Sequence, residues 1–387
     1  MVEGDGGPLP SLNGEVGRVW VGGEGGYPVV VGRGVAAALP ELLSKMAAGR
    51  SVALISDSNV MPLHGVVVSE GLRLAGLRFS EHVFEAGEGS KNRKTWSILT
   101  DEMLEAGHGR DSVVIGVGGG VTTDLAGFVA ATFMRGVPII QLPTSALAMI
   151  DASVGGKTGV DVRAGKNLVG AFHRPTAVLA DVDTIATLPR NERGEGLVEA
   201  VKHGAILDLH HFETLERDVP RLLDGEPDAF AQIVLRSVEL KAGVVDQDEF
   251  EAGYRQVLNF GHTTGHAIEA AAEYRLGHGS AVALGMRAEA AMGERLGVTE
   301  AGTGARLESL LRALIGPIQA GLSPEQVEAF LGADKKARGG RARYVLLDGV
   351  GRAALGDGWT HTVPAPVARI SLEGVLSGDG SLPPTRS

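Results

Sequence analysis

Short apolar, β-rich runs alternate with helical patterns between about residues 19 and 185, and this alternation constrains the fold more than any other feature of the chain. Alternation of this kind predicts a largely parallel sheet with helices on its faces. Residues 51–57 end in a carboxylate at the expected carboxyl edge of a strand, where open α/β sheets bind ligands. The runs that we interpret as strands are 29–31, 51–55, 112–117, 138–142 and 177–179.

The pattern changes after Leu188-Pro189, where apolar residues recur with the helical period and strand signals almost disappear. We therefore expect a second, helical domain. One late β-hairpin is expected from residues 341–347 and 353–355, with its turn at Asp348-Gly349. The expected helices cover residues 195–217, 227–246, 262–273, 279–296, 303–314 and 324–332.

The chain contains no cysteine, which excludes disulfides, thiolate zinc sites, iron–sulfur clusters and a cysteine nucleophile. Any metal ion must therefore be held by His, Asp or Glu. The formal net charge of −11 and the lack of a long basic run argue against nucleic acid or an anionic membrane as a partner. No uncharged apolar run approaches the ~18 residues of a membrane span, and the N-terminal sequence lacks a signal-peptide pattern. We therefore expect a cytoplasmic location.

A glycine-rich loop follows the expected strand 112–117 and leads directly into an apolar helix. The backbone N–H groups of Gly118-Gly119-Gly120 would be exposed to a phosphate at the helix N-terminus, with Asp124 in the first turn. The loop is not the G-x-G-x-x-G dinucleotide fingerprint, and close strand–helix packing explains the glycines equally well. Nearby, Asp57 and Asn59 would suit a ribose, and Glu88 and Lys91 would suit a polar clamp, although each pair is also typical of an ordinary turn.

A polar cluster interrupts an apolar region around residues 149–167. Gly155-Gly156 would let the backbone approach a ligand. The lysines, together with Arg135 upstream, would suit a phosphate monoester. A solvated loop with an Asp–Lys pair is the alternative, but we prefer the ligand-binding interpretation because these residues lie between glycines and are flanked by apolar segments. The members of the cluster are Asp151, Lys157, Lys166 and Asn167.

Most of the histidines that could bind a metal lie in the expected helical domain. Glu199, Lys202 and His203 share one helix face. His262 and His266 are four residues apart at the start of another helix, and His278 follows. One carboxylate and two histidines make a catalytic zinc site that leaves one coordination position open. Spacing nominates His262 and His266 as the histidine ligands, and leaves His278 and His203 open.

Five segments together resemble the 3-dehydroquinate synthases of the sugar phosphate cyclase family. The likeness runs in order and spacing from about residue 29 to about residue 355, which makes it far more specific than any one motif. The segments are GGGVTTDLAGFVAATFMRG (118–136), DASVGGKT (151–158), GKNLVGAF (165–172), GLVEAVKHG (196–204) and LNFGHTTGHAIE (258–269).

This resemblance implies a Rossmann-like N-terminal domain over residues 1–187 and a helical metal- and substrate-binding domain over residues 188–387. It also implies an active site in the cleft between them, a homodimer, tightly held NAD and one Zn²⁺ ion, with Co²⁺ as a substitute. The zinc ligands of the family match Glu199, His262 and His278. The position that matches His266 contacts the substrate phosphate instead.

Further site residues are implied by the same resemblance. Arg135 would come from the partner subunit, and either Lys335 or Lys336 would lie near the phosphate. Expected NAD contacts are Asp57, Asn59, Glu88, Lys91, Gly119, Gly120, Val121, Asp124, Thr144, Ser145, Lys157 and Lys166. The expected substrate pocket comprises Asp151, Lys157, Asn167, Lys202, Lys241, Arg255, Asn259 and His266.

The implied reaction converts 3-deoxy-D-arabino-heptulosonate 7-phosphate, a sugar phosphate, to 3-dehydroquinate and phosphate in the shikimate pathway. It proceeds through oxidation of a carbinol, β-elimination of phosphate, return of the hydride, ring opening and an aldol closure.

A sister cyclase, such as aminodehydroquinate synthase or 2-deoxy-scyllo-inosose synthase, is the second hypothesis. Lys241, Arg255 and Asn259 favour a substrate with a carboxylate, which the amino analogue retains. A polyol dehydrogenase of the same architecture and a noncatalytic NAD-binding protein are a third and a fourth hypothesis. A polyol dehydrogenase would release NADH instead of recycling it.

Overall fold

The structure is a computed structural model that describes residues 11–377 except 24, 47–49, 164 and 338–341, and it leaves the side chains of residues 45–46 and 332–337 undescribed. The chain divides into two compact units. Unit 1 comprises Met1–Pro189 and Pro227–Ala242, and unit 2 comprises Arg190–Glu226 and Gly243–Ser387.

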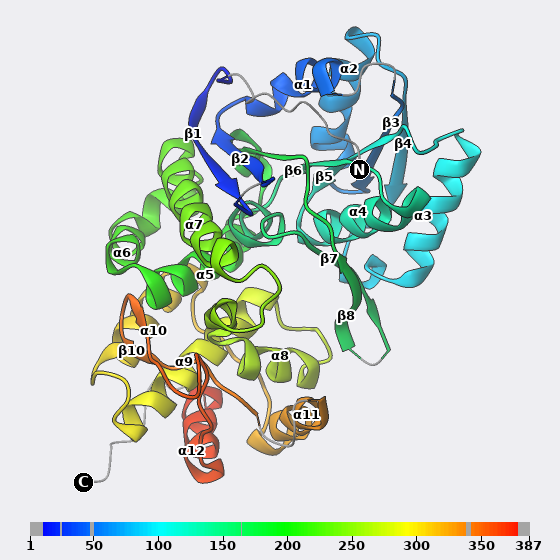
Figure 1. Cartoon of the computed structure of the whole chain (residues 1–387). Helices are drawn as coiled ribbons and strands as arrows, with labels where there is room; N and C mark the ends of the chain where they lie inside the picture. Colours follow the sequence, from blue (N-terminus) through cyan, green and yellow to red (C-terminus); the bar gives the residue numbers. More distant parts are fainter. Residues whose placement is uncertain (1–10, 24, 47–49, 164, 338–341, 378–387) are drawn as a thin grey trace. The chain divides into compact units, whose positions relative to one another are not determined.

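A seven-stranded sheet forms the centre of unit 1, in the order β1-β2-β9-β6-β5-β3-β4 (Figure 1). Every neighbouring pair is parallel except β1 and β2, which pair antiparallel at one edge. The strands are β1 (Glu15–Val21), β2 (Tyr27–Gly32), β3 (Val52–Asp57), β4 (Phe79–Phe84), β5 (Val113–Gly118), β6 (Ile139–Pro143) and β9 (Ala177–Asp181).

Alternate residues of the central strands face opposite sides of the sheet, and each side has its own apolar core. On one side, Val52 and Leu54 belong to the same cluster as residues of α1 (Leu39–Met46) and α2 (Val66–Leu74). On the other side, Ala53 and Ile55 cluster with residues of α3 (Arg93–Glu105) and α4 (Gly120–Thr132). The strands are buried on both faces, which is why they appear in the sequence as continuous apolar runs.

The expected parallel sheet is confirmed, and each of the five predicted runs overlaps a strand of it and extends at most one residue beyond the strand's start. The sequence analysis did not predict β1, β4, or the antiparallel hairpin of β7 (Lys157–Val162) and β8 (Gly165–Phe172). These strands carry many exposed or half-buried residues and therefore lack the apolar run that marks a central strand. Much of the polar cluster of residues 149–167, for which a solvated loop was the alternative interpretation, thus lies on a hairpin.

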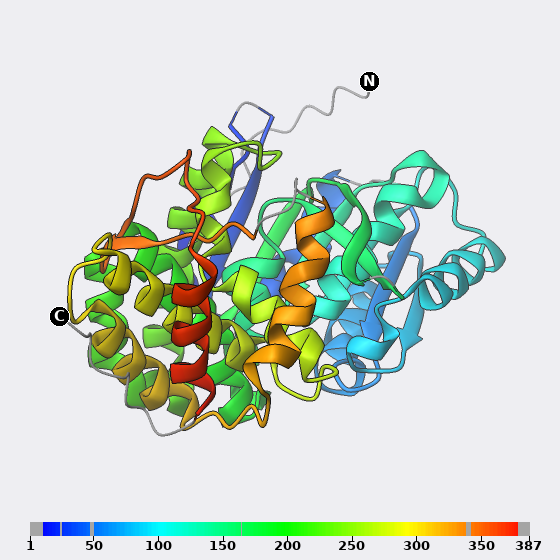
Figure 2. The ribbon, with the colours of Figure 1, turned by 90° about the horizontal axis from the view of Figure 1, so that it is seen from below.

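Unit 2 is built mainly from helices, as expected. Its apolar core includes residues of α8, α9 and α12, and α12, red in Figure 2, lies against α9. Within the described residues, no helix is long and apolar enough to span a bilayer. The helices of the second half of the chain are α5 (Arg190–Leu207), α6 (Leu209–Asp224), α7 (Pro227–Gln247), α8 (His262–Ala271), α9 (His278–Leu296), α10 (Thr303–Ile315), α11 (Pro324–Ala337) and α12 (Ala365–Leu376).

One expectation for this half is wrong, and another is confirmed only in part. The segment 195–217 is not one helix, because the extended backbone of Asp208 separates α5 from α6 and its carboxylate accepts hydrogen bonds from the first turn of α6. The late hairpin is shorter than expected. Its strands are β10 (Leu347–Gly349) and β11 (Arg352–Ala353), so Asp348-Gly349 belongs to a strand and the turn follows it. Residue 341, the expected start of the hairpin, lies outside the described residues.

Candidate active site

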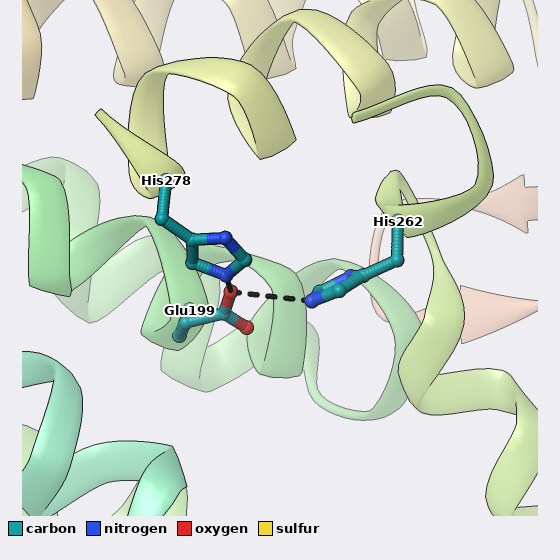
Figure 3. Close-up of side chains that lie close together, drawn as sticks. All are labelled: Glu199, His262 and His278. Atoms are coloured by element: carbon teal, nitrogen blue, oxygen red, sulfur yellow. Dashed lines mark ion pairs between the residues drawn. The ribbon is translucent and has the colours of Figure 1, made fainter. Parts of the chain in front are cut away.

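Three helices of unit 2 bring one carboxylate and two imidazoles together. Glu199 lies in the buried middle of α5, His262 is the first residue of α8, and His278 is the first residue of α9. Glu199 Oε1 lies 3.5 Å from His262 Nε2 and 3.4 Å from His278 Nε2 (Figure 3). One ligand atom from each of the three side chains lies within 4.8 Å of the other two. The three donor atoms therefore converge on one point.

Local backbone structure explains why each of the two histidines is the first residue of a helix. Gly261 precedes α8 with a positive φ of 77°, a left-handed conformation that glycine adopts without strain. The Asn-Phe-Gly-His sequence therefore turns into α8 at His262. Gly277 also directly precedes its helix, but with extended backbone, and it places His278 at the first position of α9.

The donor set fits a zinc ion. Ligand atoms about 2.0 Å from a tetrahedral zinc ion are separated by about 3.3 Å, close to the two distances observed here. The second oxygen of Glu199, Oε2, lies 2.5 Å from Lys202 Nζ, so one oxygen is held by the ammonium and the other faces the imidazoles. Glu199 and Lys202 are both buried. Three protein ligands leave one position for substrate or water, which is the pattern of catalytic zinc sites.

Electrostatics keep one imidazole neutral. Burial, together with the Lys202 ammonium, lowers the pKa of His262 to about 3, although Glu199 opposes the shift. Its nitrogen lone pair is therefore available at neutral pH. Burial alone would lower the pKa of His278, but hydrogen bonds with Glu199 and Glu269 outweigh burial and raise it to about 10. A metal ion bound here would displace a proton from His278.

A second group of possible ligands lies beside the first. His266, Glu269 and His278 each offer an atom within 4.8 Å of the other two. His266 is exposed, whereas Glu269 is buried. The ring of His266 lies 5.2 Å from that of His262 and 6.2 Å from that of His278, measured between centroids. The pair nominated by spacing, His262 and His266, thus falls into two different groups.

In unit 1, the glycine loop lies at the carboxyl edge of the sheet, where β5 passes into α4. Gly119 directly precedes α4, and the N–H of Thr144, at the end of β6, donates to the carbonyl of Gly118. The Asp57 carboxylate accepts hydrogen bonds from the Asn59 N–H at 3.0 Å and from Thr122 Oγ1 at 2.9 Å. The ends of β3, β5 and β6 are thereby joined at the edge where a dinucleotide would bind.

Three ion pairs in unit 1 join residues that the sequence analysis singled out. Lys91 pairs with Asp124, and Lys166 Nζ lies 3.0 Å from Glu88 Oε1. Burial opposes the charge on Lys91, but Asp124 and Glu88 outweigh it and raise the pKa of Lys91. In the third pair, Lys241 Nζ donates to Asp151 Oδ1 at 2.6 Å and to the Asp151 carbonyl at 2.7 Å.

The other expected residues are spread over both units. In unit 1, Lys157 and Asn167 are exposed on the β7–β8 hairpin, Arg135 is exposed after α4, Val121 lies in the first turn of α4, and Ser145 follows Thr144. In unit 2, the buried Arg255 donates from Nη1 to the Glu249 carbonyl at 2.5 Å, and Asn259 Nδ2 donates to Glu251 Oε1 at 2.6 Å. Lys335 and Lys336 lie on α11, but their side chains are outside the described part of the structure.

Sequence analysis missed three buried or half-buried carboxylates around the ligand helices. Glu269 lies 3.6 Å from His278 Nδ1, Glu289 accepts hydrogen bonds from the first turn of α8, and Glu195 accepts from the first turn of α9. For Glu269, the signal was its position three residues after His266, which puts both on one helix face. Glu289 and Glu195 accept hydrogen bonds from residues of another helix, and no local sequence spacing reveals such contacts.

Solved structures of similar fold carry sugar-cyclase names. A structure of 2-deoxy-scyllo-inosose synthase complexed with carbaglucose-6-phosphate, NAD⁺ and Co²⁺ matches with a TM-score of 0.85 and 25% identity, over 94% of this chain and 100% of that one. The 2-epi-5-epi-valiolone synthase of Streptomyces hygroscopicus subsp. jinggangensis, with NAD⁺ and Zn²⁺ bound, matches with a TM-score of 0.83 and 28% identity, over 91% of this chain and 97% of that one. Fold and site therefore define a cyclase-like protein with a candidate metal centre in its helical unit.

Comparison with sequence families narrows this class. The 3-dehydroquinate synthase N-terminal model matches residues 81–195, and the 3-dehydroquinate synthase C-terminal model matches residues 196–337. The 3-dehydroquinate synthase of Symbiobacterium thermophilum is 43% identical over 328 residues, which cover 84% of this chain and 92% of that protein. The chain belongs to the 3-dehydroquinate synthase family.

Proposed function

We propose that the protein is a 3-dehydroquinate synthase, a phosphate-eliminating carbon–oxygen lyase that converts 3-deoxy-D-arabino-heptulosonate 7-phosphate to 3-dehydroquinate and phosphate in the shikimate pathway. The observation that carries the proposal is the convergence of Glu199, His262 and His278 in a chain of this family. A carboxylate and two imidazoles with one open position suit a metal ion that binds a substrate hydroxyl.

The proposed cofactors are Zn²⁺, with Co²⁺ as a substitute, and NAD. When bound, zinc would acidify substrate hydroxyls and NAD would accept and return a hydride. Glu199, His262 and His278 would hold the metal, and the carboxyl edge of β3, β5 and β6 would hold NAD. Two similar structures that contain NAD⁺ together with Co²⁺ or Zn²⁺ support this assignment. We assign NAD binding to residues 1–187 and metal and substrate binding to residues 188–387, with further substrate contacts from the first range.

The chain's own residues would bind and orient the substrate. We assign neutralisation of the phosphate to Lys157, Asn167 and His266, and binding of the carboxylate to Lys241 and Arg255. Asp151, Lys202 and Asn259 would hold substrate hydroxyls or the groups that contact them. The Lys202 ammonium also fixes the Glu199 carboxylate, since it lies 2.5 Å from Oε2. Arg135 would act in the partner subunit of a homodimer, and its exposure is compatible with that role.

A sister cyclase is the second candidate, because the two similar solved structures bear the names of such enzymes. Arg255 and Lys241 favour a substrate with a carboxylate, because both are buried cations that could bind one. A cytoplasmic location is part of the same proposal.

The test is phosphate release from 3-deoxy-D-arabino-heptulosonate 7-phosphate by purified protein with NAD and Zn²⁺, with mass detection of the product. We expect 3-dehydroquinate without net NADH, and loss of at least about 100-fold of the activity in His262→Ala, which lacks one metal ligand. His210→Ala is the matched control, because His210 is exposed on α6.

Three outcomes would contradict the proposal. Turnover of amino-sugar phosphates only would indicate a sister cyclase, and net NADH from simple polyols would indicate a dehydrogenase. Full activity of His262→Ala would remove the metal centre from the mechanism.

A further inference from the structure

The imidazole of His278 is held at both nitrogens by carboxylates from two different helices. Its Nε2 lies 3.4 Å from Glu199 Oε1 on α5, and its Nδ1 lies 3.6 Å from Glu269 Oε2 on α8. The Glu269 side chain is only 4% exposed, and the proposed reaction gives it no role. A buried carboxylate next to an imidazole nitrogen calls for a physical explanation, since burying a charge is costly unless it is paired.

Ligand chemistry supplies that explanation. A neutral imidazole has one N–H and one lone pair, so when Nε2 binds a metal ion the proton must be on Nδ1. The Nδ1–H of His278 is then best paired with an acceptor, and a carboxylate in this position also makes the imidazole a better electron donor to the metal. Glu269 Oε2 is the carboxylate oxygen that lies next to Nδ1.

We propose that Glu269 is a positioning residue of the metal centre, which fixes His278 in the Nδ1–H tautomer and orients its Nε2 lone pair toward the ion held with Glu199 and His262. This inference rests on the proposed metal centre. Glu269 acts only through His278 and does not itself contact substrate.

A second metal ion bound by His266, Glu269 and His278 is the competing explanation of the same geometry. Those three side chains also offer atoms within 4.8 Å of one another. That ion would require His278 to bind metal through both nitrogens, and therefore to lose its last N–H proton as an imidazolate. An N–H facing a carboxylate requires no such deprotonation, so the positioning role is the simpler one.

The test measures metal binding directly. Metal-free protein is titrated with Zn²⁺ against a competing chelator, and with Co²⁺ while the visible absorption of the bound ion is recorded. The variants are Glu269→Ala, Glu269→Gln and, as a matched control, Glu273→Gln, whose exposed carboxylate lies four residues further along the chain, just after α8. Circular dichroism and thermal unfolding of each metal-free variant show that it is folded.

We expect one ion per wild-type chain and a dissociation constant raised about 10- to 100-fold in Glu269→Ala. Glu269→Gln should lose less affinity, because its amide oxygen still accepts from Nδ1–H, and its Co²⁺ spectrum should shift because the charge is gone. Glu273→Gln should match the wild type. If Glu269→Ala does not fold, the metal affinity and the Co²⁺ spectrum of Glu269→Gln test the proposed role of Glu269.

Each other outcome overturns the inference in a distinguishable way. Unchanged affinity and spectrum in both Glu269 variants would overturn it and leave the metal centre intact. Two ions in the wild type and one in Glu269→Ala would make Glu269 a ligand of a second ion. No metal binding by wild-type protein would overturn the inference together with the proposed metal centre.

Discussion

At the scale of single residues, burial is the main cause of the pKa shifts of several titratable side chains. His108 is the clearest example outside the candidate site. Its Nδ1 lies 3.0 Å from Ser51 Oγ and from Ser112 Oγ, and its Nε2 lies 2.6 Å from Ser80 Oγ. Burial lowers the pKa of His108, with smaller effects from His82 and Arg78. The serine hydroxyls therefore surround a neutral imidazole.

This arrangement predicts acid sensitivity of unit 1. The unfolded chain binds the His108 proton near its ordinary pKa of 6.5 and the folded chain only at lower pH, so the free energy of unfolding falls as pH drops below about 6.5. His108→Gln should cost about 1–3 kcal/mol at pH 8 through lost hydrogen bonds and should flatten the dependence between pH 7 and 5. Urea unfolding of metal-free protein at several pH values measures both effects. If the free energy of unfolding of His108→Gln falls as steeply between pH 7 and 5 as that of the wild type, groups other than His108 cause the acid sensitivity.

Glu289 predicts the opposite pH dependence. It is fully buried on α9 and accepts from the N–H of Gly261 at 2.8 Å and from the N–H and Oγ1 of Thr264 at 3.2 and 3.1 Å. Burial raises its pKa from 4.5 to about 8, although these hydrogen bonds oppose the shift. The folded chain thus retains a proton that the unfolded chain has lost, and stability falls as pH rises from about 4.5 through 8.

Two substitutions separate the hydrogen bonds of Glu289 from its charge. Glu289→Gln resembles the neutral form, so it should be the milder change at pH 7 and should show less loss of stability between pH 6 and 9. Glu289→Ala leaves buried donors without an acceptor and should cost about 1–3 kcal/mol for each. Chemical denaturation across this pH range tests both. Equal pH slopes in the wild type and Glu289→Gln would show that Glu289 is already charged at neutral pH.

At the scale of elements, α8 and α9 approach each other closely through glycines. A Cβ on Gly285 of α9 would lie 1.9 Å from the carbonyl oxygen of Gly261 and 2.7 Å from the nitrogen of Gly265. Both of these partners are backbone atoms, which cannot rotate away as a side chain would. Since His262 begins α8 and His278 begins α9, this approach also helps to set the distance between the two imidazoles.

Gly285→Ala should therefore separate the two helices. We expect a loss of stability of about 1–3 kcal/mol or more from overpacking, together with weaker metal binding. Gly243→Ala is the matched control, because a methyl group added to Gly243 of α7 would meet nothing within 4 Å, and it should gain up to about 1 kcal/mol. Thermal unfolding and Zn²⁺ titration measure the two effects. If Gly285→Ala is destabilised but binds metal with unchanged affinity, the close approach of the two helices does not set the distance between the two imidazoles.

At the scale of the whole molecule, the residues proposed to bind the metal and those proposed to bind NAD belong to different units. Glu199, His262 and His278 belong to unit 2, whereas the glycine loop and Asp57 belong to unit 1. A ligand that binds only the folded state stabilises the segments that form its site. The two proposed cofactors should therefore protect different parts of the chain.

Hydrogen exchange measured by mass spectrometry tests this division. Removal of metal by a chelator should speed exchange in α5 and in the first turns of α8 and α9. Addition of NAD should slow exchange at the ends of β3 and β5 and the start of α4. His262→Ala should abolish the first effect and retain the second. Protection of α8 and α9 by NAD in the metal-free protein would contradict the assignment.

The sequence predicted most of the central strands because they are buried on both faces and therefore appear as apolar runs. It missed the β7–β8 hairpin because exposed residues such as Lys157 and Asn167 give no such run. It also joined α5 to α6, since the break at Asp208 depends on one residue's backbone conformation and not on periodicity. Local pattern therefore predicts elements well where burial is uniform, and less well where it is mixed.

The sequence by itself determined the fold class and, through the absence of cysteine, that a metal must be held by carboxylates and imidazoles. It also supplied the family motifs that point to Glu199, His262 and His278. Only the tertiary structure decided which of the available nitrogens converge, because donor atoms brought together from α5, α8 and α9 depend on how separate helices pack. Periodicity within one helix relates His262 to His266, but it cannot report that His278 on another helix lies as close to Glu199 as His262 does.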